Sequence, residues 1–248
     1  MSGPLLELRG ATKRFGGITA LNEVSLTVPR GGIVGVIGPN GAGKTTLFNL
    51  ITGAYDLTSG EILFEGRSVA GLRPHRIARL GLARTFQNIR LFPSMTVREH
   101  LLVGQRGGGL RLADLLPSGG AARVGRAELA MRRFGLEAHR DRLAATLPYG
   151  LQRKVEMARA WTAAPKLLLL DEPVAGMNHD EAQDLAVLLR ALRGEGLSIL
   201  LIEHDMPFVM GLCDHLHVLD FGVPIAEGAP EAVRANPVVL DAYLGAPA

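Results

Sequence analysis

Eight residues between an apolar run and a helical run constrain this chain more than any other feature. Gly38-Pro-Asn-Gly-Ala-Gly43-Lys44-Thr45 fits the pattern G-x-x-x-x-G-K-S/T. The segment follows the strand-like run IVGVI and precedes TTLFNLI, which we expect to be a helix ending near Gly53. In such a unit the backbone N–H groups of the loop turn inward and cradle phosphate oxygens at the helix N-terminus. The segment therefore predicts an α/β fold that binds a phosphorylated ligand.

The side chains at the end of this loop have separate tasks in binding a nucleoside triphosphate. Lys44 would bridge the β- and γ-phosphates, and the Thr45 hydroxyl would ligate Mg²⁺. Thr46 is placed to bond the α-phosphate. The alternative is a glycine-rich turn with no ligand. With 31 glycines in 248 residues, a chance match is on the order of a few per cent, and the strand–loop–helix context makes it rarer still.

A second acidic motif supports the same interpretation. Leu167–Leu170 form a short apolar run, and Asp171 and Glu172 follow directly. This places Asp171 at the carboxyl end of a buried strand, where open α/β sheets bind ligands. Asp171 would hold Mg²⁺ through water, and Glu172 could polarise an attacking water as a general base. A strand-end Asp-Glu pair alone is more often a helix cap or a solvated turn, but the phosphate loop favours the catalytic reading.

Three histidines and one glutamine are weaker candidates. His204 follows the strand-like run SILLIE, which we expect beside the strand that bears Asp171, so contact with the γ-phosphate is plausible. Gln87 in ARTFQN carries little signal alone. His215 and His217 lie two apart, hence on one face of a strand. Because no cysteine or carboxylate pairs with them in the sequence, we interpret these two histidines as structural.

Composition excludes several classes of function. The net charge is only +3 and aromatic residues make up 5%, so neither a basic surface nor a base-stacking platform is indicated, and we expect no nucleic-acid partner. No apolar run approaches the roughly 20 residues that cross a bilayer. The N-terminus lacks a secretory signal, and Cys213 is the single cysteine, which fits a reducing compartment. We expect a soluble cytoplasmic chain.

The order of the elements predicts an interrupted α/β core. Strand-like runs occupy Leu5 to Phe64, a helical region extends from about Gln87 to Trp161, and strand–helix alternation returns from Lys166. Within the helical region, the stretch GQRGGGLRLADLLPSGGAARVG is expected to be a loose surface connection because of its glycines. The helical middle is thus an insertion between two halves of one core, and a short helical tail ends the chain.

Taken in this order, the motifs resemble those of the ATP-binding cassette ATPases over nearly the whole chain. GPNGAGKTT is similar to the Walker A loop and LLLLDEP to Walker B, while AGMN is similar to the D-loop. The resemblance assigns Phe15 to the aromatic that stacks on adenine, Gln87 to the Q-loop and His204 to the switch histidine. The segments ARTFQNIRLFPSMTVREHLLVG, DEPVAGMN and PEAVRANPVVLDAYLG resemble the branched-chain amino-acid and amide uptake ATPases within that superfamily.

This resemblance implies a P-loop NTPase (RecA-like) α/β core with an antiparallel β subdomain and an inserted α-helical subdomain. Residues 1–248 would form a single cassette, with 1–86 and 162–248 as the core and 87–161 as the helical subdomain. The implied activity is ATP hydrolysis coupled to solute import, with ATP and Mg²⁺ as cofactors. The implied catalytic residues are Glu172, His204 and Gln87, and the implied metal ligands are Thr45, Gln87 and Asp171. The implied nucleotide-binding residues are Phe15, Gly38, Pro39, Asn40, Gly41, Ala42, Gly43, Lys44, Thr45, Thr46, Pro148, Tyr149, Gly150 and Leu151.

The resemblance also implies partners. Two cassettes would close head to tail, each ATP lying between the Walker A loop of one chain and the signature of the other. The pair is expected to be a heterodimer, with a homodimer as the alternative. It would lie peripherally on the cytoplasmic face of the inner membrane, act on two transmembrane permease subunits, and receive solute from an extracytoplasmic binding protein.

The signature region departs from the family pattern. Where the family most often has Leu-Ser-Gly-Gly-Gln, this chain has Leu147-Pro-Tyr-Gly-Leu151. Pro148 removes a hydroxyl and a backbone N–H, Tyr149 replaces a glycine, and Leu151 replaces Gln or Glu; Asn178 also stands where many D-loops carry Asp. Because the signature faces the partner's ATP, we expect an asymmetric pair in which the partner's nucleotide lies in the weaker site.

Two alternatives from other classes stay open at this point. A soluble cassette ATPase acting on ribosomes or DNA usually carries two cassettes, long coiled-coil insertions or basic arms, none of which is seen here. An inactive regulatory cassette is disfavoured at this chain's own Walker site by the presence of Lys44, Asp171, Glu172 and His204.

Overall fold

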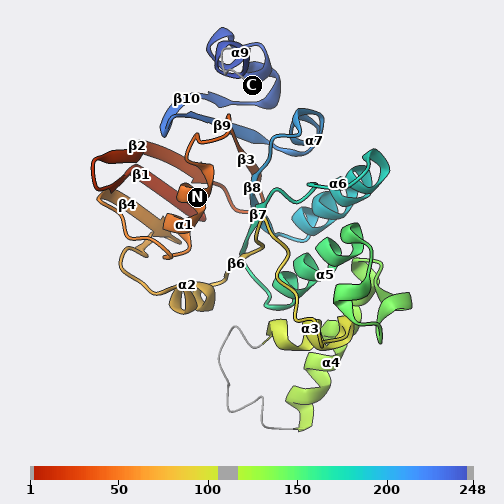
Figure 1. Cartoon of the computed structure of the whole chain (residues 1–248). Helices are drawn as coiled ribbons and strands as arrows, with labels where there is room; N and C mark the ends of the chain where they lie inside the picture. The colour runs from red at the N-terminus through yellow and green to blue at the C-terminus, as the bar shows by residue number, and fades with distance from the viewer. Residues whose placement is uncertain (1–2, 106–116, 245–248) are drawn as a thin grey trace.

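Two sheets and a layer of helices make up the fold (Figure 1). The computed structural model describes residues 3–105 and 117–244. The strands are β1 (Leu6–Phe15), β2 (Ile18–Val28), β3 (Ile33–Ile37), β4 (Ser59–Phe64), β5 (Arg67–Ser68), β6 (Leu82–Arg84), β7 (Leu167–Asp171), β8 (Ser198–Ile202), β9 (His215–Asp220) and β10 (Val223–Gly228). The α-helices are α1 (Lys44–Ile51), α2 (Pro74–Leu80), α3 (Val97–Gly104), α4 (Pro117–Arg133), α5 (Tyr149–Thr162), α6 (His179–Gly194), α7 (Met206–Leu212), α8 (Pro230–Arg234) and α9 (Pro237–Leu244). Short 3-10 turns lie at Glu137–His139 and Ala144–Thr146.

The central sheet has the strand order β10-β9-β3-β8-β7-β6. Neighbours from β9 to β6 are parallel, and only β10 joins antiparallel, to β9. Every residue of β3, β7 and β8 is buried, as continuous apolar strands covered on both faces must be. The parallel sheet predicted from the strand–helix alternation is confirmed, and so is the expected adjacency of the Asp171 strand and the strand that precedes His204.

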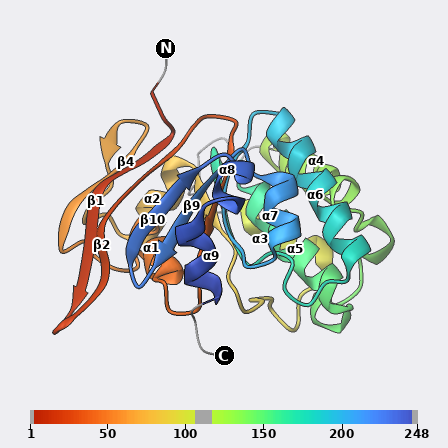
Figure 2. The ribbon, with the colours of Figure 1, turned by 90° about the horizontal axis from the view of Figure 1, so that it is seen from above.

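A second, antiparallel sheet has the order β2-β1-β4-β5. Its inner residues pack with α1 and with one face of the central sheet in a shared apolar core. Val34 and Val36 of β3 belong to this core, whereas Ile33 and Ile37 belong to the core on the opposite face, because successive strand residues point to opposite sides. Figure 2 shows the resulting layers, with β1, β2 and β4 on one side and α3 to α7 on the other.

The helical layer contains the segment predicted as an insertion. Helices α3, α4 and α5 pack against one another and contribute to the core on the second face of the sheet. The predicted boundaries of this subdomain stay a prediction. Of the stretch expected to be loose, residues 106–116 lie outside the described residues. Its second half is helical, since α4 begins at Pro117; proline suits the first turn of a helix, and the alanines and arginines that follow favour the helical state.

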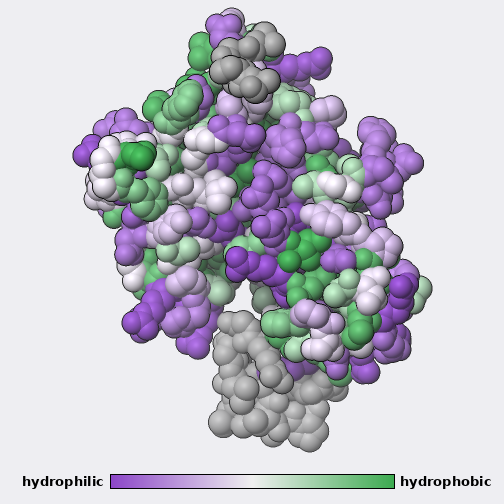
Figure 3. Space-filling model, viewed as in Figure 1, coloured by the Kyte–Doolittle hydropathy of each residue, from purple (hydrophilic) through white to green (hydrophobic). Residues whose placement is uncertain are grey.

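The helices, the surface and the single cysteine can be compared with what the composition indicated. None of the helices in the described ranges is both long and apolar enough to span a bilayer. Figure 3 shows hydrophilic and hydrophobic residues interspersed over one face of the molecule. Cys213 is buried with a free thiol, and burial raises its pKa to about 12, so this side chain is a small, un-ionised residue of the core.

Candidate active site

The phosphate-loop motif occupies the turn from β3 to α1. Gly38 and Gly43 both have positive φ, at 149° and 96°. A Cβ at Gly38 would collide with the carbonyl oxygen of Leu219, and one at Gly43 would lie 2.7 Å from the carbonyl oxygen of Ala20. Glycine is therefore required at these two positions both by backbone conformation and by space. The loop is held closely between β9 and β2, which fixes the direction of its N–H groups.

Lys44 begins α1 and folds back over its own loop. Its ammonium donates hydrogen bonds to the carbonyl oxygens of Gly38 (2.6 Å) and Pro39 (2.8 Å). Burial lowers the pKa of Lys44, while Glu172 and Asp171 act in the opposite direction. The cation thus lies at the mouth of the loop, between the loop carbonyls and two carboxylates, where an incoming phosphate would complete its coordination.

The other loop residues remain accessible. Asn40, Gly41 and Thr45 are exposed, and Thr46 is half-buried on the first turn of α1. No glutamate or aspartate lies in the first turn of this helix, so its N-terminal N–H groups face no competing anion from α1 itself.

Asp171 ends β7 and is held by an arginine that the sequence analysis missed. Its Oδ2 accepts a hydrogen bond from Arg84 Nη2 at 2.8 Å, and both side chains are largely buried. Arg84 ends β6, the strand next to β7, and also donates to Asn49 Oδ1 of α1 at 2.7 Å. The one available signal was the short strand LAR before the Gln87 segment. Arg84 joins the metal-binding candidate to the helix that follows the phosphate loop.

The three predicted metal ligands fit a hard cation. Thr45 offers a hydroxyl, Asp171 a carboxylate and Gln87 an amide oxygen, and oxygen donors are what Mg²⁺ prefers beside substrate phosphates. The roles of these three residues stay predictions.

The side chains of Gln87 and His204, two of the predicted catalytic residues, both lie close to the carboxylate of Glu172. Its Oε2 accepts a hydrogen bond from Gln87 Nε2 at 3.0 Å, and its Oε1 lies 3.9 Å from His204 Nδ1. The backbone of Glu172 has φ 48°, an unusual conformation for a non-glycine residue that clusters at active sites. Its N–H donates to the carbonyl oxygen of Ile202 in β8. The structure therefore brings Gln87, Glu172 and His204 together near the carboxyl ends of β7 and β8; their catalytic roles stay predictions.

Glu203 is a buried carboxylate next to this cluster that the sequence analysis did not single out. It accepts hydrogen bonds from the backbone N–H groups of Val174 (2.9 Å), His204 (3.0 Å) and Asp205 (3.3 Å). Burial raises the pKa of Glu203, and these N–H groups act against that shift. One side chain thus joins the segment after Glu172 to the segment that carries His204.

The residues of the variant signature lie at the start of α5. Pro148 is the N-cap, with φ −52° and ψ 151°, and makes no side-chain cap. Tyr149 is exposed and its ring packs against Gly176, while Gly150 is buried against the carboxylate of Glu181 at the start of α6. Leu151 is half-buried. Within one chain Tyr149 and Gly150 thus contact residues that follow Walker B; the predicted role of the four signature residues toward a partner's nucleotide is untested.

The helix that follows the signature holds the Gln87 segment through buried charges. Arg153 Nη1 donates to the carbonyl oxygen of Phe86 at 2.6 Å, and Nη2 donates to that of Gln87. Glu156, paired with Arg153 at 3.3 Å, accepts from the N–H groups of Phe86 and Arg90. Both charged side chains are at most 2% exposed. Sequence reasoning recognised the helix but not this role, because the partner atoms are backbone groups nearly seventy residues away.

Phe15 ends β1 and remains 42% exposed. Its ring meets that of Tyr55 edge-on at 5.2 Å between centroids, and Lys13 Nζ lies 4.8 Å from its centre. An exposed, supported aromatic is compatible with stacking on a base, but that role stays a prediction.

One interpretation is corrected. His215 and His217 were read as lacking a carboxylate partner, but Glu227 of β10 lies opposite His217, with Oε2 3.1 Å from Nδ1. The sequence did not show this because the pairing register shifts between Pro224 and Ala226.

Residues 21–175, more than half of the chain, match the family model "ABC transporter", and residues 223–248 match "Branched-chain amino acid ATP-binding cassette transporter". The chain is 46% identical to the "High-affinity branched-chain amino acid transport ATP-binding protein BraF" of Pseudomonas aeruginosa, with 99% of both chains covered. It is 46% identical to LivG of Escherichia coli, named in the same words, again over 99% of each chain.

Solved structures give the same result for the fold. A nucleotide-free ATP-binding cassette from an ABC transporter superposes with a TM-score of 0.88 at 32% identity, covering 98% of this chain and 100% of that one. The ADP conformation of an ATP-binding cassette superposes with a TM-score of 0.87 at 32% identity, with the same coverage. The expected α/β cassette fold is confirmed.

Proposed function

This chain belongs to the ABC transporter family as an ATP-binding cassette, and we propose that it is the ATP-hydrolysing subunit of an importer for branched-chain amino acids or related amides. The 46% identity with branched-chain amino acid transport ATP-binding proteins over 99% of the chain supports this solute class. Cassettes of this family are ATPases that bind nucleotide. The observation that carries the proposal is the arrangement of Lys44, Asp171, Glu172, Gln87 and His204 around the carboxyl ends of the central strands.

Different residues of this site would bind the phosphates and the metal ion. The loop N–H groups and Lys44 would bind the β- and γ-phosphates, whose negative charge replaces the loop carbonyls as the partner of the Lys44 ammonium. Thr45 and Asp171 would hold Mg²⁺, with Gln87 as the third proposed ligand, and the ion would neutralise charge on the β- and γ-phosphates. Arg84 binds Oδ2 of Asp171, which leaves Oδ1 of the carboxylate for the cation or its water.

Glu172 and His204 are proposed to act on the attacking water and the γ-phosphate. Glu172 would accept the hydrogen of the water as a general base. His204, whose side chain is 63% exposed and 3.9 Å from Glu172, would contact the γ-phosphate. Phe15 would stack on adenine, with Thr46 on the α-phosphate.

We propose a partner arrangement in which two cassettes close head to tail on two membrane permeases. In this arrangement Pro148, Tyr149, Gly150 and Leu151 face the second subunit's nucleotide, and the second cassette is a different chain or, alternatively, a copy of this one. An extracytoplasmic binding protein would deliver the solute, and the cassettes would lie peripherally at the cytoplasmic membrane surface. The division into a core of 1–86 and 162–248 and a helical subdomain of 87–161 is part of this proposal.

The alternatives have less support. The relatives described above are named as transport proteins, so nothing favours a ribosome- or DNA-directed ATPase. A purely regulatory cassette is disfavoured because the hydrolytic residues are present and assembled.

The test is Glu172→Gln in the assembled transporter. Removing the general base should lower the rate of ATP hydrolysis by about 100-fold or more, while ATP binding is retained because the phosphate contacts of Lys44 and the loop are intact. Nucleotide binding by equilibrium dialysis and turnover by phosphate release separate the two effects. Val187→Ala, on the exposed face of α6, is the matched control and should hydrolyse ATP at the normal rate. Unchanged hydrolysis in Glu172→Gln would refute the assignment, and co-purification with ribosomes rather than permeases would refute the importer.

A further inference from the structure

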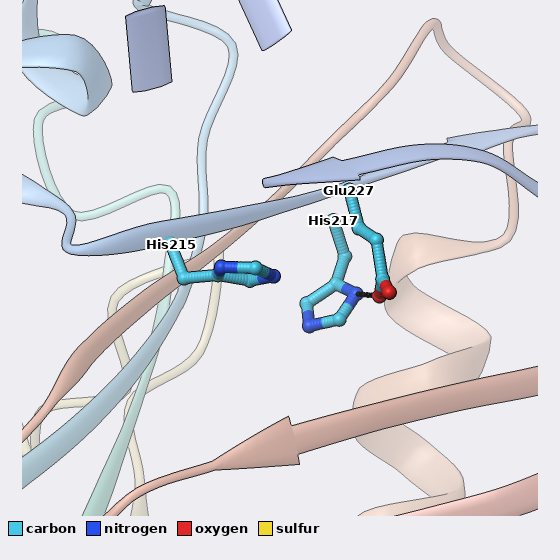
Figure 4. Close-up of side chains that lie close together, drawn as sticks. All are labelled: His215, His217 and Glu227. Atoms are coloured by element: carbon cyan, nitrogen blue, oxygen red, sulfur yellow. Dashed lines mark ion pairs between the residues drawn. The ribbon is translucent and has the colours of Figure 1, made fainter. Parts of the chain in front are cut away.

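Three side chains on the β9–β10 hairpin lie together in a group that the ATPase site does not use. His215 and His217 come from β9 and Glu227 from β10, as Figure 4 shows. One ligand-type atom of each lies within 4.8 Å of the other two. The two imidazole rings meet edge-on at 5.0 Å between centroids.

The backbone register creates this group. Between Pro224 and Ala226 the pairing shifts by one residue, so Glu227 lies opposite His217. With the register of the turn, where Val223 pairs with Asp220, Glu227 would lie opposite Leu216 and point to the other face of the sheet. The β-bulge thus places the carboxylate on the same face as the two imidazoles.

The interior of the group has an unsatisfied donor or acceptor. His217 is 6% exposed in its side chain, and its Nδ1 lies 3.1 Å from Glu227 Oε2. Its other ring nitrogen, Nε2, is buried without a hydrogen-bond partner. Buried polar atoms are normally paired, but Nε2 of His217 is not. The contact between Nδ1 and Glu227 is therefore the polar contact that orients this ring.

We propose that His215, His217 and Glu227 form a binding site for a divalent transition-metal ion of the Zn²⁺ class. Two imidazoles and one carboxylate are a donor set that such ions prefer. Two ligand atoms about 2.0–2.1 Å from a tetrahedral metal are about 3.3 Å apart, close to the 3.1 Å between His217 Nδ1 and Glu227 Oε2. The third ligand, His215, is half-buried, and its ligand-type atom lies within 4.8 Å of those of His217 and Glu227, so it must move closer to both when an ion binds.

The position of the site indicates what a bound ion does. Glu227 is 66% exposed, so an ion can enter from solvent, and three protein ligands leave a fourth position for water. The hairpin turn at its other end contacts the phosphate loop, where the N–H of Gly222 donates to the carbonyl oxygen of Ala42 at 3.1 Å. A metal that joins β9 to β10 stabilises the hairpin that supports this loop.

The test uses the full-length chain without an affinity tag, freed of metal by a chelator. Titration with Co²⁺ is expected to give one bound ion per chain, seen by its visible ligand-field absorption. Zn²⁺ should displace the bound Co²⁺ and abolish this absorption, whereas Mg²⁺ should not. Zn²⁺ is also expected to raise the melting temperature in the absence of nucleotide. Glu227→Gln and His215→Asn each change a side chain with solvent access and should weaken Co²⁺ binding at least tenfold while the metal-free protein melts normally.

The matched control is His75→Asn, which alters an exposed histidine on α2 and should bind Co²⁺ normally. His217→Asn should also abolish binding; because it changes a buried residue, it is judged only if its metal-free circular dichroism is unchanged. The proposal is overturned if no stoichiometric Co²⁺ binds, or if binding survives in both Glu227→Gln and His215→Asn, which would show an adventitious ion only.

Discussion

At the scale of single residues, His100 shows how one buried side chain fixes a protonation state. Its Nε2 accepts a hydrogen bond from the backbone N–H of Phe92, and its Nδ1 lies 2.9 Å from the carbonyl oxygen of Thr96. These partners require a neutral ring with its proton on Nδ1. Burial lowers the pKa of His100, with Arg159 acting in the same direction and Thr96 and Glu99 against it.

The contribution of His100 to the free energy of unfolding should therefore decrease as the pH is lowered. In the unfolded chain the pKa of histidine is about 6.5, so between that value and the lower folded pKa the unfolded state binds more protons. The contribution of His100 is present above about pH 6.5 and is lost as the pH falls toward the folded pKa. Urea unfolding of wild type and His100→Gln at about pH 8 and about pH 5 checks this.

The expected result is a smaller loss of unfolding free energy on acidification in His100→Gln than in wild type. His75→Gln, at an exposed position on α2, should show the wild-type pH dependence. Equal losses in wild type and His100→Gln would contradict the assignment.

The same scale shows how far the sequence could predict the site. Lys44, Asp171 and Glu172 follow from local patterns, since each lies at a strand end or a loop whose geometry the neighbouring residues determine. Arg84 and Glu203 could not be predicted, because their functions depend on contacts with Asp171 and with three backbone N–H groups. Such contacts exist only after the strands are paired.

At the scale of elements, hydrogen bonds of two buried side chains of α5 hold the Gln87 segment to this helix. The side chains of Arg153 and Glu156 bind four backbone groups of residues 86–90. The pair is almost fully buried, so its two charges compensate each other where water does not reach. A displacement of α5 must carry the Gln87 segment with it.

Removing half of this pair should be more harmful than removing all of it. Arg153→Met leaves the Glu156 charge buried without its partner and should lower the unfolding free energy by about 3–5 kcal/mol. Arg153→Met with Glu156→Met should recover much of that loss, because two apolar side chains can fill the space. Denaturant unfolding of the two variants measures the difference.

The double variant should still show lower ATPase activity in the assembled transporter, since the Gln87 backbone has lost its support. Arg132→Met, at an exposed position of α4, should change neither property. A double variant less stable than Arg153→Met would count against the interpretation of the pair as mutually compensating charges.

The positions of the strands and helices could be predicted from the sequence more reliably than the contacts of single side chains. The apolar strands before Lys44 and Asp171 and the strand–helix alternation from Lys166 were expected, and β7, α6, β8 and α7 follow one another in that order. The helical start of α4 was not expected, because Gly119 and Gly120 read as a loop in isolation. The antiparallel register of β10 was also inaccessible, since a bulge leaves no strong trace in composition.

At the scale of the whole molecule, the chain presents two unequal surfaces to a partner cassette. Its own Walker site has every expected hydrolytic residue, whereas the second residue of its signature is Pro148, which has no backbone N–H to offer a phosphate. Tyr149 packs against Gly176, which lies between Walker B and α6, and Gly150 packs against Glu181 in the first turn of α6, so the altered signature is built into the fold.

We predict an asymmetric pair of ATP sites. Pro148→Ser with Leu151→Gln should restore donors toward the partner's nucleotide, and each charge-assisted hydrogen bond is worth roughly 1.5–3 kcal/mol, or about 10- to 150-fold in the affinity of that site for nucleotide. Site-resolved nucleotide trapping in the assembled transporter measures this at each site.

Pro148→Ala is the matched control, because it restores the N–H without the hydroxyl and should give a smaller gain. A serine at this N-cap would also stabilise α5 by about 0.5–2 kcal/mol, so the melting temperature must be recorded alongside. Unchanged hydrolysis and occupancy at both sites in the double variant would disprove the asymmetry.

The bulge between Pro224 and Ala226 has a consequence for how such a chain can diverge. One residue more or less in β10 decides whether Glu227 or Ala226 lies opposite His217. A single-codon insertion or deletion on an edge strand can therefore create or remove a metal-binding triad, while every residue that handles ATP keeps its place. New chemistry on this fold can arise by a change of register, without any substitution at the ligands themselves.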